Sequence, residues 1–132
     1  MRSGIMTRMI VLMAVITALI IVSGLLAHRS VRDDSVKLEK NIETVQDSIR
    51  AEKWDSASDA LDRIRNDWTA IKKTWSALID HEEIDNIDIT ITRLEALLEA
   101  KEAASALSEA AALRRLVTHI PEREKLSMEN LF

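Results

Sequence analysis

The longest apolar stretch of the chain runs from Met9 to Ala27, 19 residues without one charged side chain. As an α-helix with a rise of about 1.5 Å per residue it would be about 28 Å long, close to the ~30 Å hydrocarbon core of a bilayer. The stretch therefore predicts a transmembrane segment, residues 9–27, that follows a short N-terminal tail, residues 1–8. The lipid bilayer is the first partner that the sequence predicts.

A cleaved signal peptide is the alternative to an anchor. Signal-peptide cores usually hold about 7–15 apolar residues, fewer than this stretch. Cleavage after Ala27 would place the large Leu25 where a small residue is preferred. The chain has no cysteine, which excludes a lipoprotein anchor. We expect an uncleaved signal anchor.

The charged residues on either side of the span do not by themselves define its orientation. Two arginines precede the span, and four basic residues follow it closely, namely Arg29, Arg32, Lys37 and Lys40. The positive-inside rule is therefore nearly balanced. An eight-residue tail that leads directly into an apolar helix is the usual layout of an anchor with a cytoplasmic N-terminus. We expect a single-pass protein of the cell membrane with its C-terminal domain outside the cytoplasm.

Beyond the span, apolar residues recur every three or four positions, as on one face of an α-helix. The first such stripe predicts a helix from about Asp34 to Glu52, within a stalk of residues 28–53, and consists of Leu38, Ile42, Val45 and Ile49. No proline or glycine lies between Gly24 and this stripe, so the membrane helix can continue into it without a break.

The second stripe is the most regular one and covers 25 residues. Two heptad positions alternate along it: Trp54, Leu61, Trp68 and Trp75 at one, and Ala57, Ile64, Ile71 and Leu78 at the other. We expect Trp54, Trp68 and Trp75 to organise the structure from within the core, where they could face the small residues Ala103, Ala106 and Ala110. The alternative is an exposed tryptophan row that forms a groove or ridge for another protein's helix.

A third helix is expected to begin at Asp80, which together with Glu83 has the spacing of a capping box. Its stripe consists of Ile84, Ile87, Ile91, Leu94 and Leu98, and the stripe of the last helix consists of Ala106, Ala110, Leu113, Val117 and Ile120. The pause between Leu98 and Ala106 predicts a tight turn, although one unbroken helix is an alternative. Pro121 is expected to end the last helix. The fold class is all-α: a transmembrane helix followed by an antiparallel bundle of three to four helices, with residues 54–120 as its main part.

Composition narrows the function classes. Two of the 18 basic residues precede the span, so the remainder holds 16 basic and 22 acidic residues, a formal net charge of −6. Such a domain is a poor candidate for binding nucleic acid. Both glycines lie at or before residue 24, so glycine-dependent phosphate loops and nucleophile elbows are excluded beyond that point. We expect no catalytic residues and no cofactor.

One constellation resembles a site: Asp80, His81, Glu82, Glu83, Asp85 and Asp88. Several carboxylates together could bind a hard cation, which would make the domain a ligand or cation sensor. The other interpretation is a helix N-terminus where acids favour the helix dipole. The tail, residues 121–132, carries the apolar residues Leu126, Met128, Leu131 and Phe132, which could fold back on the bundle or dock on a partner.

Several of these features together resemble a bacterial family, the domain of unknown function 4363. The residues concerned are Trp54 with Ala57 and Leu61, Trp68, Lys72 to Trp75, the run from Leu78 to Ile84, and the closing Asn130, Leu131 and Phe132. The resemblance covers nearly the whole chain and implies a short protein with one N-terminal span and a helical remainder. It implies no reaction. Members are often encoded beside small multi-span membrane proteins, which implies a membrane partner.

Taken together, the sequence predicts a membrane-anchored helical interaction or accessory protein. We expect it to support a neighbouring membrane protein, with the residues from Asp80 to Asp88 and the tail as contacts. The sequence leaves a homo-oligomer open.

Overall fold

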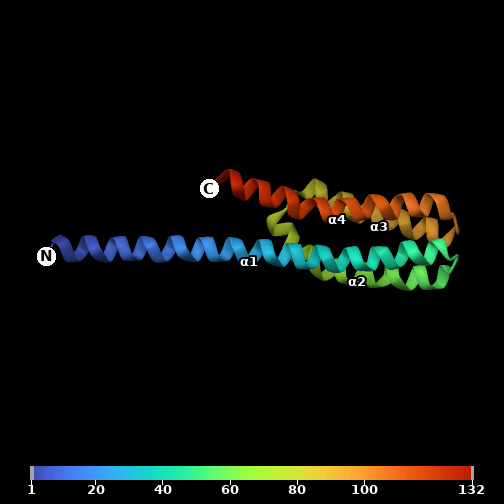
Figure 1. Cartoon of the computed structure of the whole chain (residues 1–132), viewed down its shortest axis with the longest axis horizontal. Helices are drawn as coiled ribbons and strands as arrows, with labels where there is room; N and C mark the ends of the chain where they lie inside the picture. The colour runs from blue at the N-terminus through green and yellow to red at the C-terminus, as the bar shows by residue number, and fades with distance from the viewer. Residues whose placement is uncertain (1, 132) are drawn as a thin grey trace. The chain divides into compact units, whose positions relative to one another are not determined.

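The computed structural model describes the backbone of residues 2–131, and the side chains of those residues except 124–129 and 131. Four helices follow one another along the chain: α1 (Arg2–Arg50), α2 (Trp54–Leu78), α3 (His81–Glu99) and α4 (Ala103–Leu131). They are labelled in Figure 1, where consecutive helices of the bundle run antiparallel. The all-α bundle predicted from the stripes is confirmed, and it has four helices.

The chain divides into two compact units, residues 1–30 and residues 31–132. In the first unit, apolar side chains are exposed on all sides of the helix, for instance Leu12, Ile16 and Ile20. The most apolar 18-residue window of α1 has a mean hydropathy of 2.8, and none of it is buried. In the part of the chain that the structure describes, this is the one helix long and apolar enough to cross a membrane.

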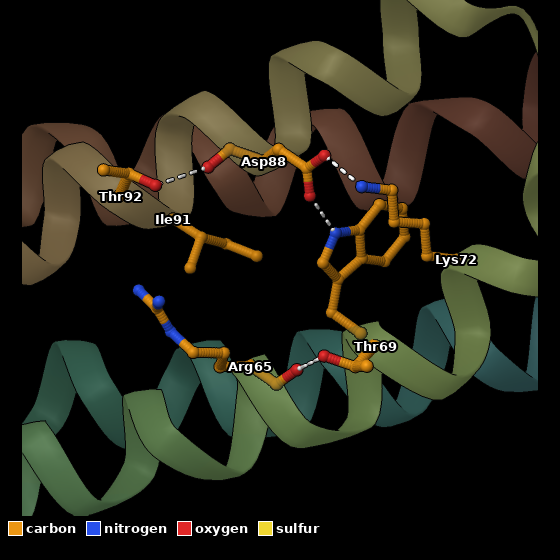
Figure 2. Close-up of a pocket in the computed structure, with 7 residues that line it drawn as sticks. Arg65, Thr69, Lys72, Asp88, Ile91 and Thr92 are labelled. Atoms are coloured by element: carbon orange, nitrogen blue, oxygen red, sulfur yellow. Dashed lines mark hydrogen bonds and ion pairs between the residues drawn. The ribbon is translucent and has the colours of Figure 1, made fainter.

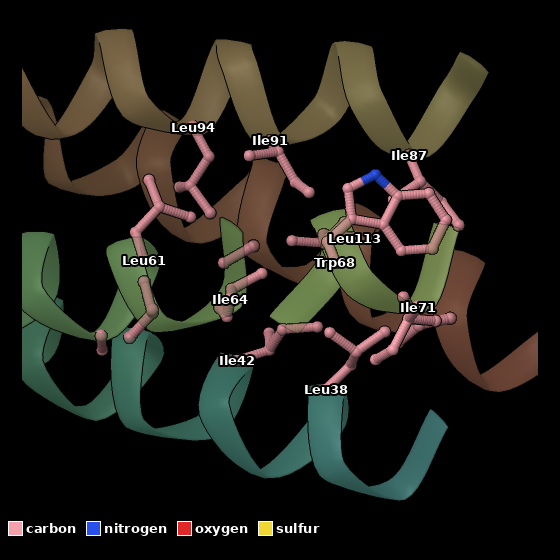
Figure 3. Packing of buried hydrophobic residues seen from close by; sticks show 14 of the residues in the cluster. Leu38, Ile42, Leu61, Ile64, Trp68, Ile71, Ile87, Ile91, Leu94 and Leu113 are labelled. Carbon is pink, nitrogen blue, oxygen red and sulfur yellow. The ribbon is translucent and has the colours of Figure 1, made fainter. Parts of the chain in front are cut away.

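The second unit surrounds a single apolar core. The α1 stripe from Val31 to Ile49 is buried, so the segment expected as a stalk takes part in the bundle from Val31 onward. At the centre, each helix contributes two side chains, and these eight leave no room for a water molecule: Leu38, Ile42, Ile64, Trp68, Ile87, Ile91, Leu113 and Val117. Figure 3 shows many of these side chains pointing inward from the surrounding helices.

The tryptophan row belongs to the core. Trp75 is fully buried and Trp68 is 4% exposed, and their rings meet edge to face with centroids 5.5 Å apart. Such a pair stabilises a core beyond the area it buries. Trp54 is half-buried at the start of α2. An exposed tryptophan row is therefore wrong, and so is the extension of the stripe to Leu78, which is 40% exposed because α2 ends there.

The turns lie where the stripes change phase. α1 ends at Arg50 and α3 ends at Glu99, which confirms the predicted break near residues 51–53 and the predicted turn before Ala106. The unbroken alternative is wrong. Each of these two helices ends in a Schellman motif: Lys53 N–H donates to the Ser48 carbonyl at 2.9 Å, and Glu102 N–H to the Leu97 carbonyl at 3.1 Å.

Both Schellman motifs need a residue with positive φ. Glycine normally fills that position, but the chain has no glycine beyond residue 24. Glu52 and Lys101 take it instead, with φ of 56° and 55°. A side chain in this left-handed region costs about 1–2 kcal/mol, so each turn carries a local strain.

The end of the last helix differs from the prediction. Pro121 does not end α4, which continues to Leu131 with the proline inside it. The predicted apolar anchors of the tail, Leu126, Met128, Leu131 and Phe132, lie outside the side chains that the structure describes. Ala106 and Ala110 are buried, so α4 contributes small side chains to the core, as the sequence predicts.

Candidate interaction site

The predicted acidic cluster begins at the first turn of α3. Asp80 occupies the N-cap position, and its backbone carbonyl accepts from the amides of Glu83, at 3.1 Å, and Ile84. Its side chain makes no capping hydrogen bond, and the Glu83 carboxylate pairs with Arg123 of α4. The predicted capping box is therefore wrong, because Glu83 has a partner on another helix.

Asp88, the last member of the cluster, lies two turns further along α3 and ties this helix to α2. One carboxylate oxygen accepts the indole N–H of Trp68 at 2.7 Å, and the other accepts the Lys72 ammonium at 2.6 Å. Figure 2 shows Lys72 and Asp88 reaching toward each other across the seam between the two helices. Asp88 thus provides the hydrogen-bond acceptor that the indole N–H of the core residue Trp68 needs.

The cluster is not gathered into one site. His81, Glu82 and Asp85 are exposed, Glu83 faces α4 and Asp88 faces α2. Within the described residues, no three histidine or acidic side chains come together as a metal site requires. His119, in α4, has its imidazole Nδ1 3.8 Å from the Glu122 carboxylate one turn further on.

The seam between α2 and α3 has two hollows at the surface. The larger, about 370 Å³, is bounded by polar side chains around the apolar Trp68 and Ile91; the polar ones are Arg65, Thr69, Lys72, Asp88 and Thr92. The smaller, about 240 Å³, lies near Asp62 and Glu99. Glu95 lines the smaller hollow and Arg65 the larger, and these two pair with each other across the seam.

The larger hollow offers a mixed surface for recognition. The hydroxyls of Thr69 and Thr92 donate to backbone carbonyls of their own helices, so their lone pairs can accept from a bound group. Arg65 uses one terminal nitrogen for Glu95 and has further N–H groups to donate. The hollow can therefore bind a group with both donors and acceptors over a small apolar floor (Figure 2).

The sequence contains a signal for this seam in the spacing of four charged residues. Arg65 and Lys72 lie seven residues apart on α2, and their partners Asp88 and Glu95 lie seven apart on α3. Seven residues are two helical turns, so each pair shares one helix face, as in antiparallel coiled coils with charged flanks. Matching these spacings would have predicted that α2 and α3 are neighbours.

Charged groups tie other helices as well. Between α1 and α2, the Asp67 carboxylate accepts from the amide of Asn41 at 3.0 Å and pairs with the Lys37 ammonium at 3.4 Å. Between α1 and α4, Arg114 donates to the carboxylates of Glu39, at 3.0 Å, and Glu43, at 2.8 Å. These pairs are half-exposed, so each adds modest stability, but together they specify which helices lie side by side.

The fold changes the proton affinity of one carboxyl group on α1, that of Asp34. Burial raises the pKa of Asp34 on α1, and the negative charge of Asp33 acts in the same direction. The nearby Trp75 indole N–H and the Lys37 ammonium lower it by less. The indole N–H is buried with no acceptor at hydrogen-bond distance, so it faces the Asp34 carboxyl without a short contact.

Comparison with known proteins identifies a family for this chain but no individual relative. No curated protein matches the chain, and no solved structure matches it either. The model of one family, described as domain of unknown function (DUF4363), matches residues 25–131. That match covers the whole bundle, including the tryptophan row and the first turn of α3. The resemblance noted in the sequence is thereby confirmed, and the chain belongs to the family of the domain of unknown function 4363.

Proposed function

We propose that this protein is a single-pass, membrane-anchored accessory subunit that binds a neighbouring membrane protein through its bundle and catalyses no reaction. In this proposal residues 9–27 span the cell membrane, the N-terminus is cytoplasmic, and the bundle lies on the outer side. The single observation that carries the proposal is the contrast in α1: an apolar helix exposed on all sides, followed by a stripe buried in a filled core.

The exposed apolar surface supports the anchor. Soluble monomeric proteins rarely expose continuous apolar patches of more than a few hundred Å². Around this helix the apolar side chains are about half exposed or more at nearly every position, for example Leu12 at 60% and Ile20 at 64%. Such a surface favours lipid over water, because the hydrophobic effect scales with the apolar area removed from water.

The paired charges and the filled interior support a role in binding. The eight side chains at the centre of the bundle leave no room for water, so no ligand fits among them, and the two hollows of the α2–α3 seam lie at the surface. Two surface features offer contacts: the α2–α3 seam, and the exposed acids Glu82 and Asp85 in the first turns of α3. The net charge of −6 beyond the span favours a partner with a basic surface, since complementary charge raises association rates and specificity.

Site-specific photo-cross-linking in native membranes tests the proposal. A cross-linking residue at Thr69 or Thr92 reports on the seam, one at Glu82 reports on the first turn of α3, and one at the exposed Ala112 of α4 is the matched control. We expect one defined membrane protein to be captured from the seam or from Glu82, but not from Ala112. Equal capture from all positions, or none in intact cells, would contradict the proposal. A product of twice the chain's mass would indicate self-association instead.

Reporter fusions at the C-terminus test the orientation separately. Alkaline phosphatase, which is active only outside the cytoplasm, should be active in this position, whereas a cytoplasmic reporter should be silent. The reverse pattern would invert the proposed topology and leave the anchor itself unchallenged.

A further inference from the structure

Pro121 creates a defect inside α4. A proline has no backbone N–H, so the carbonyl four residues earlier loses its helical donor, and the proline ring crowds that same carbonyl. In α4 this carbonyl belongs to Val117, which is 1% exposed. Water cannot reach a carbonyl at this depth freely, so another group of the protein must satisfy it.

Ser35 of α1 supplies the missing donor. Its hydroxyl donates to the Val117 carbonyl at 2.6 Å, across 82 residues of sequence. Ser35 is itself 4% exposed, so the bond is shielded from solvent at both ends. A side-chain hydroxyl on one helix thus replaces the backbone N–H that the proline removes from another.

α4 has buried side chains before Pro121, whereas the side chains described after it are exposed. Before it, Val117 and Ile120 are buried in the core. After it, Arg123 pairs with Glu83 of α3, and the Arg123 side chain is 61% exposed. Glu122 and Asn130 are exposed as well. Among the side chains that the structure describes, Ile120 is the last buried one of α4.

We infer that Pro121 is a hinge, and that the Ser35 hydrogen bond is the latch that holds the hinge in the position that the structure shows. Helices bend at prolines because the missing hydrogen bond removes a restraint. The segment from Pro121 to Leu131 is then an arm that moves as one helix about Pro121 while the bundle stays folded. The latch lies on the α1 side of the hinge, and the Arg123–Glu83 pair is a second, weaker restraint on the α3 side.

This device goes beyond the proposed accessory role and does not depend on it. A helical arm with a closed and an open position can present its surface to another molecule without unfolding the core. The arm opens only when both restraints give way, and the Arg123–Glu83 pair is the one that a competing contact can reach, because it is the more exposed of the two.

The chain has no cysteine, so two labels can be placed at will. Nitroxide labels at Asn130→Cys on the arm and Glu82→Cys on α3, both exposed positions, report the position of the arm through their distance distribution in the full-length protein. We expect one narrow distribution in the labelled parent. Ser35→Ala should broaden it, because the Val117 carbonyl loses its donor and the arm opens.

The double variant Ser35→Ala/Pro121→Ala decides the mechanism. Alanine at 121 restores the backbone N–H, so the distribution should become narrow again although Ser35 is still missing. Broadening by Ser35→Ala that persists in the double variant would show that Ser35 merely fills space, and it would overturn the inference. An unchanged distribution in Ser35→Ala would overturn it as well. Ser48→Ala is the matched control, because Ser48 is also a buried serine of α1, and it should leave the distance unchanged.

Hydrogen exchange keeps the inference testable if Ser35→Ala fails to fold. Pro121→Ala alone restores the intrahelical bond without touching Ser35. We expect the arm amides of Pro121→Ala to exchange several-fold more slowly than those of the parent, while the amides of α2 and α3 stay as they are. Equal exchange of the arm in both proteins would contradict the hinge.

Discussion

The two halves of α1 share one secondary structure but distribute their apolar side chains differently around the helix. Up to Leu26 the apolar side chains surround the helix and are exposed, whereas from Val31 most of them form one buried stripe with charged residues on the other faces. A helix that is apolar on all sides belongs in lipid or in a large core, and a helix with one apolar stripe belongs at the surface of a water-soluble fold. The distribution of apolar residues in the first half is therefore typical of a signal anchor or a signal sequence, and that in the second half is typical of a helix in a bundle.

The largest effect should come from the same substitution made in each half. Leu38→Ala removes a side chain that is 1% exposed at the centre of the bundle. We expect it to lower the free energy of unfolding by about 2–5 kcal/mol. Leu12→Ala, at a position 60% exposed, should leave the unfolding of the bundle unchanged. Chemical denaturation followed by tryptophan fluorescence measures both, since Trp68 and Trp75 lie in the core. Equal losses would mean that the two halves share one core.

The reverse experiment adds a charge to each half at positions of similar exposure. Ile16 is 47% exposed and Val36 is 50% exposed, both on α1. Lysine at the centre of a span costs about 3 kcal/mol of apparent insertion free energy, so Ile16→Lys should reduce the membrane-integrated fraction. Val36→Lys should change neither insertion nor stability by more than about 0.5 kcal/mol. Glycosylation-based insertion assays give the integrated fraction, and full insertion of Ile16→Lys would argue against a span.

How much of the fold and of the candidate site the sequence predicts depends on how far apart in the chain the interacting residues lie. The helices, the phase break near residue 51 and the buried tryptophans follow from local spacing, because apolar periodicity needs no knowledge of the partner. The pairing of Asp88 with Trp68 and Lys72, and that of Ser35 with Val117, join residues far apart in the chain. They depend on helix order and rotation, which a stripe leaves undefined.

The continuation of α4 through Pro121 shows the same limit. Proline alone predicts that the helix ends here, and this prediction is wrong: the Val117 carbonyl, which Pro121 leaves without its helical donor, accepts a hydrogen bond from Ser35, 86 positions before the proline. In a similar way, the absence of glycine beyond residue 24 conceals two Schellman turns, in which Glu52 and Lys101 take the position that glycine normally fills.

Asp88→Ala tests the seam between α2 and α3. The change leaves the buried Trp68 N–H without its acceptor, which should cost about 1–3 kcal/mol of unfolding free energy. Asp88→Asn keeps an oxygen for the indole and should cost less. Glu95→Ala, which breaks the half-exposed pair with Arg65, is the matched control and should cost less than about 1 kcal/mol. If Glu95→Ala cost as much as Asp88→Ala, the indole bond would not be the important contact.

Lys101→Gly should stabilise the bundle, an unusual direction for a glycine substitution. Glycine adopts the φ of 55° at this position without the clash of a Cβ, and we expect a gain of up to about 1 kcal/mol. The neighbouring Ala100, with φ of −75°, is the control, because glycine there only adds entropy to the unfolded chain and should destabilise. Thermal unfolding of the two variants side by side gives the sign, and a loss of stability in Lys101→Gly would refute the strain.

The smallest effect concerns Asp34 and pH. Because burial raises the pKa of Asp34 in the folded state above its ordinary value of 3.8, the folded protein holds this proton more tightly than the unfolded chain. The contribution of Asp34 to stability therefore increases as pH falls through the raised pKa and levels off below the ordinary value. Asp34→Asn should be slightly more stable than the parent at neutral pH, and the difference should vanish in acid. Asp59→Asn, at an exposed position, should show neither change.

Cysteine accessibility in detergent-free membranes tests the account most directly, because the parent chain has no cysteine of its own. A maleimide should label Thr92→Cys on the bundle surface once it reaches that side of the membrane, and it should leave Ile16→Cys unlabelled until detergent dissolves the bilayer. Labelling of Ile16→Cys at the rate of Thr92→Cys in intact membranes would show that water surrounds the apolar half of α1, and the membrane anchor would have to be abandoned.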